Sequence, residues 1–327
     1  MLILFTSPYR SFTDNLSEMN KITPGNSGIW KTLKGTDDIN NFDYIIILDN
    51  IDKHLEKLGK DNFMKLINND YNKIIHFQRE HINILKFEKK TWYNTDIFPK
   101  LKNKFMANDY KFTFKFPSFI NKTYDELKNL KYPEKNKLLS SIVSYKKGTI
   151  YVKKVGADYL KRINLLTKYS KSHPNKIDIF GKGWPKDKLG SNYKGELGSY
   201  HKNNVTNTSK YDGLIDYDYS IALVNFSEEK LFNEKITDCI LCWAMPIYSG
   251  HKDVKKCFPE DSYYLINLDD KNVISKIDKF VESKPTEDNI KALAEARELI
   301  LDKYNIWEQI YQVITNYDNF VKEYSLK

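Results

Sequence analysis

The sequence predicts an α/β fold of two Rossmann-like domains that face each other across a cleft, followed by long C-terminal helices. Three observations support this prediction: short apolar runs alternate with helical stretches, a polar stretch near residue 130 interrupts the alternation, and the chain ends in amphipathic helices. A chain of 327 residues is also long enough to form two domains, each with its own hydrophobic core.

The N-terminal third carries the signals of a β-α-β series. Apolar runs at 2–6, 44–48 and 74–77 indicate strands, and apolar residues between 55 and 67 recur at helix-like spacing. The run at 44–48 is continuous and bounded by acids, which is typical of a parallel strand covered on both faces.

The boundary between the domains is predicted in the polar stretch 110–137, where periodicity is lost and prolines favour turns. We therefore expect an N-terminal α/β domain at 1–135, a second α/β domain at 136–285 and C-terminal helices at 286–327.

A second β-α-β series follows the boundary, and open sheets of this kind bind ligands at the carboxyl ends of their strands. Thr286 is expected to begin the C-terminal helices, because a hydroxyl followed by two acids complements the exposed amides of a first turn. We expect strands at 138–145, 176–180, 217–225, 245–248 and 263–268, and helices at 159–169 and 234–243.

Composition argues against several classes of protein. There is no apolar run of about 18 residues, so no transmembrane helix is expected, and the N-terminus lacks the basic start of a signal peptide, so a cytoplasmic location is expected. Cys239, Cys242 and Cys257 form no four-ligand metal pattern, and the first two lie in an apolar helical pattern that predicts a buried structural role.

The net charge of +9 comes almost entirely from lysine and favours an anionic ligand or surface. No compact block of basic residues of the kind that binds nucleic acid stands out, so no nucleic-acid partner is expected.

Dinucleotide and P-loop motifs are absent, which leaves the stretch from Tyr217 to Gly250 as the densest group of candidate site residues. Apolar residues at helix-like spacing predict a helix that begins at Glu234 with Asn233 as its cap. The first-turn amides and Lys235 would favour a phosphate, and Glu234 could accept hydrogen bonds from ribose. Alternatively, Glu234 only complements the helix dipole and Lys235 is solvated.

A second, weaker signal is the turn at 180–184, in which Gly181 and Gly183 could bring the backbone close to a phosphate. A plain turn explains these two glycines better, because glycines are common wherever the chain reverses.

The segment from about 210 to 270 resembles the donor-binding half of the α-1,3/α-1,4-fucosyltransferase family. Matching residues are Lys210, Leu214, Tyr217, Tyr219, Leu223 and Asn225 in a first block, Glu234, Lys235 and Ile236 in a second, the stretch 246–250 with Tyr248 and Gly250 in a third, and Pro259, Ser262 and Tyr263 in a fourth. Gly181 in the strand and turn at 177–183 and Ser144 at the end of the preceding strand match as well.

This resemblance implies a GT-B fold, GDP-fucose as donor, a glycan acceptor, inversion at the anomeric carbon and no catalytic metal or other cofactor. Glu234 would then hold the ribose, Lys235 the diphosphate and Asn225 the donor pocket. The basic residue that neutralises the leaving diphosphate would be Lys194, Lys202 or Arg162. The sequence departs from the family pattern at Val224, Asn233 and Ser249.

The N-terminal domain is expected to bind the acceptor and to supply the catalytic base, because inverting transfer needs a base near the acceptor hydroxyl. The stretch 73–81 resembles the family's strand that ends in a glutamate, which makes Glu80 the candidate base. His76 is expected to point inward from this strand, and His81 is the other residue there that could touch the acceptor.

Three alternatives remain open. Asp216 and Asp218 form a D-x-D pattern that could bind a divalent ion in a metal-dependent GT-A glycosyltransferase. The replacement of an acid by Val224 would suit a non-catalytic glycan-binding protein. The donor could also be another GDP-sugar.

Overall fold

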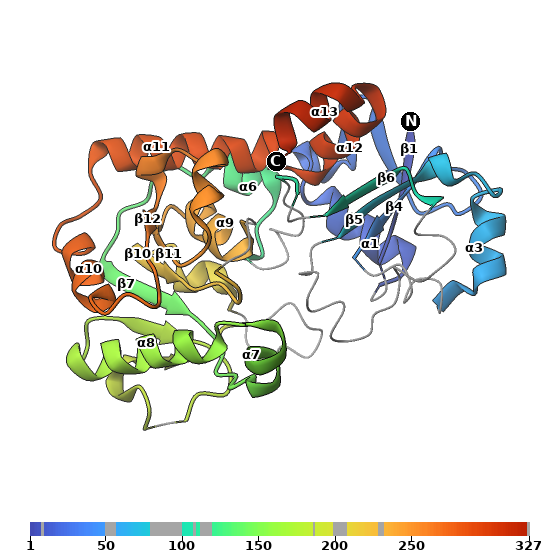
Figure 1. Ribbon diagram of the computed structural model, residues 1–327. Coiled ribbons are helices and arrows are strands. Elements are labelled where there is room, and N and C mark those ends of the chain that lie inside the picture. The colour runs from blue at the N-terminus through green and yellow to red at the C-terminus, as the bar shows by residue number, and fades with distance from the viewer. Residues whose placement is uncertain are drawn as a thin grey trace. The chain divides into compact units, whose positions relative to one another are not determined.

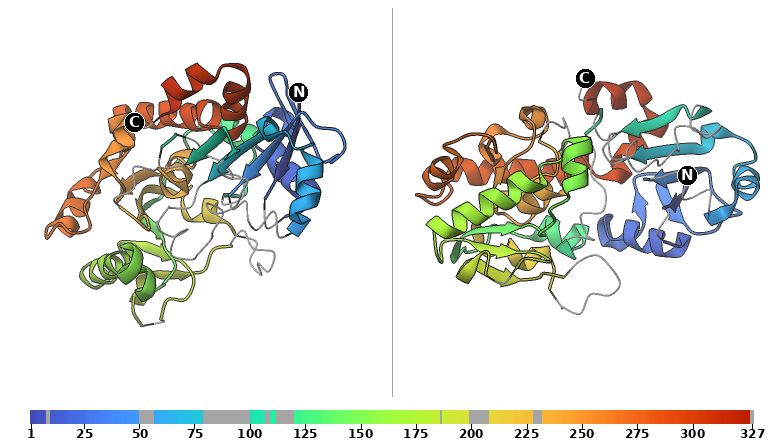
Figure 2. Two further views of the ribbon diagram at one scale, coloured as in Figure 1. Left: turned by 45° about the vertical axis from the view of Figure 1, so that its right-hand side comes forward. Right: turned by 60° about the horizontal axis from the view of Figure 1, so that its bottom comes forward.

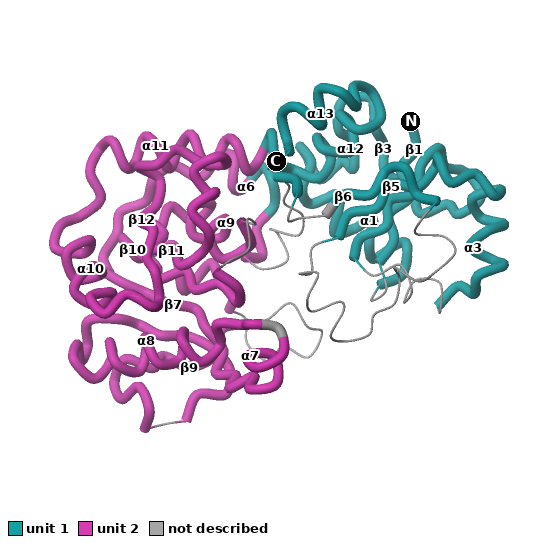
Figure 3. Tube along the Cα trace, in the orientation of Figure 1, with its two compact units in different colours: residues 1–117, 123–125, 302–327 teal, residues 118–122, 126–301 magenta. Residues whose placement is uncertain are grey.

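The computed structural model describes residues 1–7, 10–49, 57–78, 100–106, 109–111, 120–185, 187–198, 208–227 and 232–325. The chain forms two compact units, one of residues 1–117, 123–125 and 302–327 and the other of residues 118–122 and 126–301 (Figure 3). These units group residues by packing, whereas the domain bounds expected from the sequence are continuous stretches of chain, so those bounds stay a prediction.

The first unit is built on a six-stranded sheet in the order β2-β3-β1-β4-β5-β6 (Figure 1). Neighbouring strands are parallel except for the antiparallel pair β2 and β3. The strands are β1 (Leu2–Thr6), β2 (Ile29–Trp30), β3 (Leu33–Thr36), β4 (Tyr44–Leu48), β5 (Ile74–Gln78) and β6 (Asn103–Met106).

The core of this unit forms where helices cover the continuous apolar strands. Leu4, Ile45 and Ile47 pack with Phe63 of α3 (Lys60–Leu66). On α12 (Ile306–Thr315), the fully buried Trp307 ring lies 4.8 Å from that of Phe5. Helices α1 (Phe12–Asn20) and α13 (Tyr317–Tyr324) complete the unit.

The second unit contains a parallel six-stranded sheet in the order β12-β11-β10-β7-β8-β9. Counted from β7, this is the doubly wound order, in which the chain reverses direction across the sheet between β7 and β10. The strands are β7 (Lys137–Ile142), β8 (Asp178–Phe180), β9 (Tyr193–Gly195), β10 (Tyr217–Ala222), β11 (Met245–Tyr248) and β12 (Tyr264–Leu265).

Two helices of the second unit start at the capping residues that the sequence predicts. The Asn233 side chain accepts a hydrogen bond from the Lys235 amide at 3.1 Å, and Thr286 accepts one from the Asn289 amide at 3.2 Å. Both predicted helix starts are therefore confirmed. The helices are α6 (Tyr124–Asn129), whose first residues belong to the other unit, α7 (Thr149–Val155), α8 (Tyr159–Ser172), α9 (Glu234–Leu241), α10 (Val273–Phe280) and α11 (Glu287–Glu298).

The alternation of strands and helices and the long C-terminal helices are as predicted, with shorter strands in places. The run expected at 217–225 is a strand only to Ala222. Cys239 and Cys242 are buried, as predicted, Cys257 is buried as well, and none of the three forms a disulfide. Within the described ranges, none of the helices has the length and apolarity needed to cross a bilayer.

Arg297 connects α11 to the end of α9 and to the region of α6. Its guanidinium donates to the carbonyl oxygens of Leu241, Leu127 and Leu130 and lies 4.4 Å from the ring centre of Trp243. The residue is 3% exposed. Its removal would leave buried carbonyl groups without a donor.

We expect Arg297→Met to destabilise the second unit by about 3 kcal/mol, which corresponds to a fall in melting temperature of roughly 6–12 °C. Differential scanning calorimetry measures the shift. Lys291→Met is the matched control, because Lys291 on the same helix has a 75% exposed side chain. Equal shifts for the two variants would contradict this role of Arg297.

Candidate functional site

The carboxyl ends of β7 and β10 are the natural place for a ligand in the second unit. In a doubly wound sheet the loops after these two strands lead to opposite faces and leave a crevice between them. Ser144 lies just beyond the end of β7 and Asn225 just beyond the end of β10. The start of α9 follows in the chain after β10.

At the start of α9, Glu234 and Lys235 form an ion pair of 2.7 Å. Burial alone would raise the pKa of Glu234, but Lys235 and Lys210 outweigh it and hold that pKa well below the usual range. Glu234 is therefore a carboxylate at neutral pH. Burial and nearby cations lower the pKa of Lys235, against the opposing effect of Glu234.

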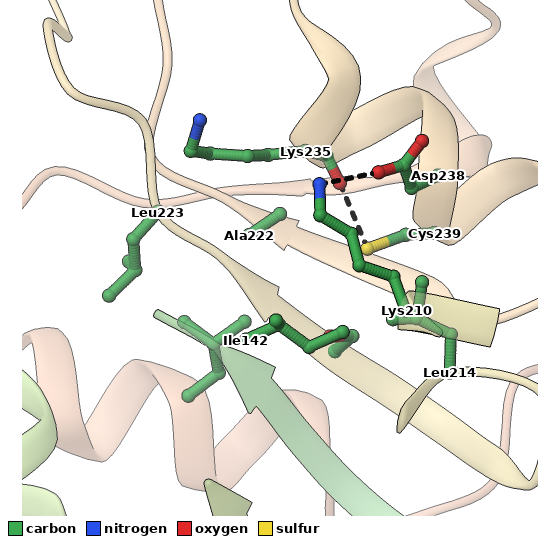
Figure 4. A pocket seen from close by; sticks show the side chains of 10 residues that line it. Ile142, Lys210, Leu214, Ala222, Leu223, Lys235, Asp238 and Cys239 are labelled. Atoms are coloured by element: carbon green, nitrogen blue, oxygen red, sulfur yellow. Dashed lines mark hydrogen bonds and ion pairs between the residues drawn. The ribbon is translucent and has the colours of Figure 1, made fainter. Parts of the chain in front are cut away.

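Beneath this pair, Lys210 Nζ lies 2.7 Å from Asp238 Oδ2 in a pocket that Lys235 and Cys239 also line (Figure 4). Burial raises the pKa of Asp238 to about 6, against the effect of Lys210. The Asp238 side chain is 2% exposed, and among the residues that the structure describes its Oδ1 has no hydrogen-bond partner. Burial disfavours the charged form of Lys210, but Asp238 and Glu234 outweigh it and raise its pKa.

Arg162 of α8 supplies a third cation. Its guanidinium donates to the side-chain oxygen of Asn225, and the residue is 5% exposed. The backbone of Asn225 is held as well, because its carbonyl accepts from the Asp158 amide at 2.7 Å. Burial lowers the pKa of Arg162 to about 10, so it stays charged at neutral pH.

These contacts gather five of the predicted site residues and leave a surplus of positive charge. Arg162, Lys210 and Lys235 face the carboxylates of Glu234 and Asp238, and the direct partner of Arg162 is a neutral amide. The amides of the first turn of α9 add partial positive charge. The arrangement therefore suits an anionic ligand such as a diphosphate.

Two of the departures from the family pattern contact each other. The Ser249 hydroxyl accepts a hydrogen bond from the Val224 amide at 3.0 Å, and both residues are 1% exposed. Ser249 thus satisfies a buried donor just beyond β10, while the Val224 side chain presents an apolar group there.

The two predicted glycines have packing roles. A Cβ on Gly181 would lie 2.1 Å from the Val143 carbonyl oxygen, and the residue has φ +147°. A Cβ on Gly250 would lie 2.2 Å from Cζ of Tyr248, whose ring is fully buried. Both glycines thus allow close contact within the protein itself, which for Gly181 favours the plain-turn interpretation.

Lys194 and Tyr217 are not brought to this group. Both contact Asp178, the first residue of β8: Lys194 Nζ lies 3.4 Å from its carboxylate, and the Tyr217 hydroxyl donates to it at 2.7 Å. Tyr217 also begins β10, so this cluster lies at the amino end of the sheet, opposite to Glu234 and Lys235.

Asp216 and Asp218 lie at that same amino end, before and at the start of β10. Burial raises the pKa of Asp218, with Lys284 and Lys135 opposing it. Among the described residues, no group of three or more His, Cys, Asp and Glu side chains could hold a metal ion.

Glu80, His81 and Lys202 lie outside the described residues, so their roles stay predictions. His76 is fully buried in β5, as predicted, and its Nε2 lies 2.6 Å from the Asp49 carbonyl oxygen. Burial lowers the pKa of His76 to about 4, so the ring is neutral at physiological pH.

Asp238 was not predicted as a site residue. It follows Glu234 by four residues, one turn of α9, so helical spacing places the two carboxylates on one face. Its pairing with Lys210 across 28 residues of chain has no such signal.

No profile of a known protein family and no curated protein matches the sequence. Among solved structures, an α-glucosyltransferase in complex with UDP-glucose and DNA containing an abasic site is similar over 96% of this chain and 99% of its own, with 10% identity and a TM-score of 0.54. This likeness shows the fold, and the predicted α/β class with two mostly parallel sheets of the GT-B type is confirmed.

Two further structures have lower TM-scores. The match to an α1,3-fucosyltransferase with GDP covers 92% of this chain and 90% of the fucosyltransferase chain at 14% identity, with a TM-score of 0.38. TarM covers 85% of this chain at 14% identity, with a TM-score of 0.43, and this chain spans 54% of TarM, about half its length.

We expect Gly181→Ala to destabilise the second unit by about 3 kcal/mol or more, because the new methyl group meets backbone atoms at a strained φ. Thermal unfolding measures the loss. Gly190→Ala is the control: Gly190 has φ +56° but open space around it, so only about 1 kcal/mol is expected. A loss for Gly181→Ala no larger than the control's would contradict the close backbone approach.

Proposed function

We propose that the protein is a glycosyltransferase that transfers fucose from GDP-fucose to a hydroxyl group of a glycan, with inversion at the anomeric carbon. The observation that carries the proposal is the cluster of Arg162, Lys210 and Lys235 at the carboxyl end of the second sheet. The fold shared with an α-glucosyltransferase and the motif resemblance support it.

The cluster suits a nucleoside diphosphate as leaving group. When the bond between the sugar and the diphosphate breaks, negative charge develops on the departing oxygen, and nearby cations stabilise it. Lys235 would contact the diphosphate directly, and Arg162, held by Asn225, would add a second cation. The carboxylate of Glu234 would accept hydrogen bonds from the ribose hydroxyls.

The proposed reaction is a direct displacement. The acceptor oxygen forms a bond to the anomeric carbon while the bond from that carbon to the diphosphate breaks, and the acceptor proton passes to the carboxylate of Glu80. GDP leaves with the bonding electrons. The side-chain cations would supply the positive charge that a divalent ion supplies in metal-dependent transferases.

The identity of the nucleotide and sugar rests on the motif resemblance alone. Another GDP-sugar would use the same phosphate and ribose contacts. A UDP-sugar would use the same cations with a different base, so affinity for both nucleotides should be measured. The alternative that uses Asp216 and Asp218 is not favoured, because these residues lie at the amino end of β10.

We expect Lys235→Gln to weaken GDP binding at least tenfold, because it removes a charged contact to the diphosphate. Isothermal titration calorimetry measures the affinity. Lys194→Gln removes the same charge at the opposite end of the sheet and should leave the affinity unchanged. Equal losses would contradict the placement of the diphosphate.

We expect Glu80→Gln to abolish transfer while GDP affinity stays within twofold, because the amide cannot accept the acceptor proton. Product formation from GDP-fucose and a panel of oligosaccharides measures transfer. Full activity of this variant would show that another group is the base, and lost GDP affinity would place Glu80 in the donor site.

We expect donor affinity to rise about three- to tenfold as the pH falls from about 7.5 to about 5.5. Burial raises the pKa of Asp238 to about 6, so this carboxylate takes up a proton in that range and the site becomes more positive. GDP-fucose is the right ligand, since its phosphates, unlike the terminal phosphate of GDP, do not titrate there. Asp238→Asn should flatten the dependence; an unchanged slope would contradict this origin.

A further inference from the structure

The positive charge of the chain is concentrated in one segment. Residues 135–177 contain ten lysines and one arginine but a single acid, Asp158. The surplus of ten positive charges in this segment exceeds the net charge of +9 of the whole chain. The basic character of the protein therefore comes from one stretch, which includes β7, α7 and α8.

Helices α7 and α8 lie next to each other in the second unit (Figures 1 and 2). The rings of Tyr151 on α7 and Tyr159 on α8 are 6.3 Å apart between centres. Gly148, just before α7, lies so close to Tyr159 that a Cβ there would be 2.6 Å from its ring. These contacts place α7 and its exposed lysines beside the start of α8.

We define the basic surface as Lys146, Lys147, Ile150, Lys153 and Lys154, in and before α7. Each of these residues is exposed. Among the described residues, no acid lies within ion-pair distance of Lys146, Lys147 or Lys153. By contrast, Lys161 in the first turn of α8 is also exposed but pairs with Asp158 and Asp269.

An apolar residue lies among these lysines. Ile150 is 51% exposed, the largest exposed fraction among the large hydrophobic residues that the structure describes. Two lysines precede it closely in the chain and two follow it. An exposed aliphatic side chain flanked by exposed lysines is the pattern of a surface that meets lipid headgroups and inserts an apolar group between them.

We propose that the basic surface binds membranes that contain anionic lipids. Each lysine near an anionic bilayer adds electrostatic attraction, and burial of the isoleucine among the acyl chains adds an apolar contribution. Nucleic acid fits less well, because a polyanion gives the isoleucine no apolar partner and the surface has no arginine for paired hydrogen bonds. This surface follows β7 at the same end of the sheet as the donor cluster but shares no residue with that cluster, and the proposal does not rest on the proposed function.

The test measures sedimentation of the full chain with vesicles of phosphatidylcholine, with and without phosphatidylglycerol, at about 0.1 M salt. Binding is expected only to the anionic vesicles. The variant with Lys146, Lys147, Lys153 and Lys154 changed to Gln should bind at least tenfold more weakly. Ile150→Ser, which keeps every charge, should reduce vesicle binding severalfold and leave binding to a DNA duplex unchanged.

A matched control removes four exposed lysines elsewhere in the second unit, at positions 252, 255, 271 and 279. This control should keep most of the vesicle binding, and melting temperatures show whether each variant is folded. Equal loss in both quadruple variants would overturn the proposal in favour of diffuse net charge. No binding to anionic vesicles would also overturn it, and duplex binding without vesicle binding would assign the surface to nucleic acid.

Discussion

Three cations, Arg162, Lys210 and Lys235, are buried at the carboxyl end of the second sheet, and the site depends on how their charge is compensated. Burial of a charge is costly unless a partner offsets it. Lys210 is offset by Asp238 and Lys235 by Glu234, but Arg162 donates to the neutral amide of Asn225 and lies 5.6 Å from the ring centre of Tyr159. The positive charge is therefore only partly compensated. The excess lies beside the start of α9, where the backbone amides add partial positive charge. A bound diphosphate would complete the compensation, which links stability of the site to its ligand.

The elements that the sequence predicted best are those whose signal is local. Strands β1, β4 and β11 match the predicted bounds, because a parallel strand covered on both faces is a continuous apolar run. The caps Asn233 and Thr286 were also predictable, since a polar side chain before an amphipathic stretch satisfies the first amides.

Features that depend on contacts between distant segments could not be predicted. Tyr217 and Lys194 meet at Asp178 because strand order brings β8, β9 and β10 into one sheet, and a six-residue strand separates its two ends by about 17 Å. Tyr217 begins the strand expected at 217–225, and such sheets bind ligands at the carboxyl ends of their strands, so its distance from the site followed from the predicted strand, whereas its partner Asp178 did not. The hydrogen bond from the Val224 amide to the Ser249 hydroxyl could not be predicted either, because the two residues are 25 positions apart and meet only in the folded chain.

The central claim is that the cluster around Arg162, Lys210 and Lys235 binds a nucleoside diphosphate. A thermal-shift series with GDP, UDP, CDP and ADP and their common sugar conjugates, each with and without a chelator, tests it most directly. A ligand that binds only the folded state stabilises it and so raises the melting temperature. At a ligand concentration of a hundred times Kd, the added free energy of unfolding is about 2.7 kcal/mol. The account predicts a rise with GDP and GDP-fucose that the chelator leaves unchanged. Failure of every nucleotide and conjugate to raise the melting temperature would contradict it.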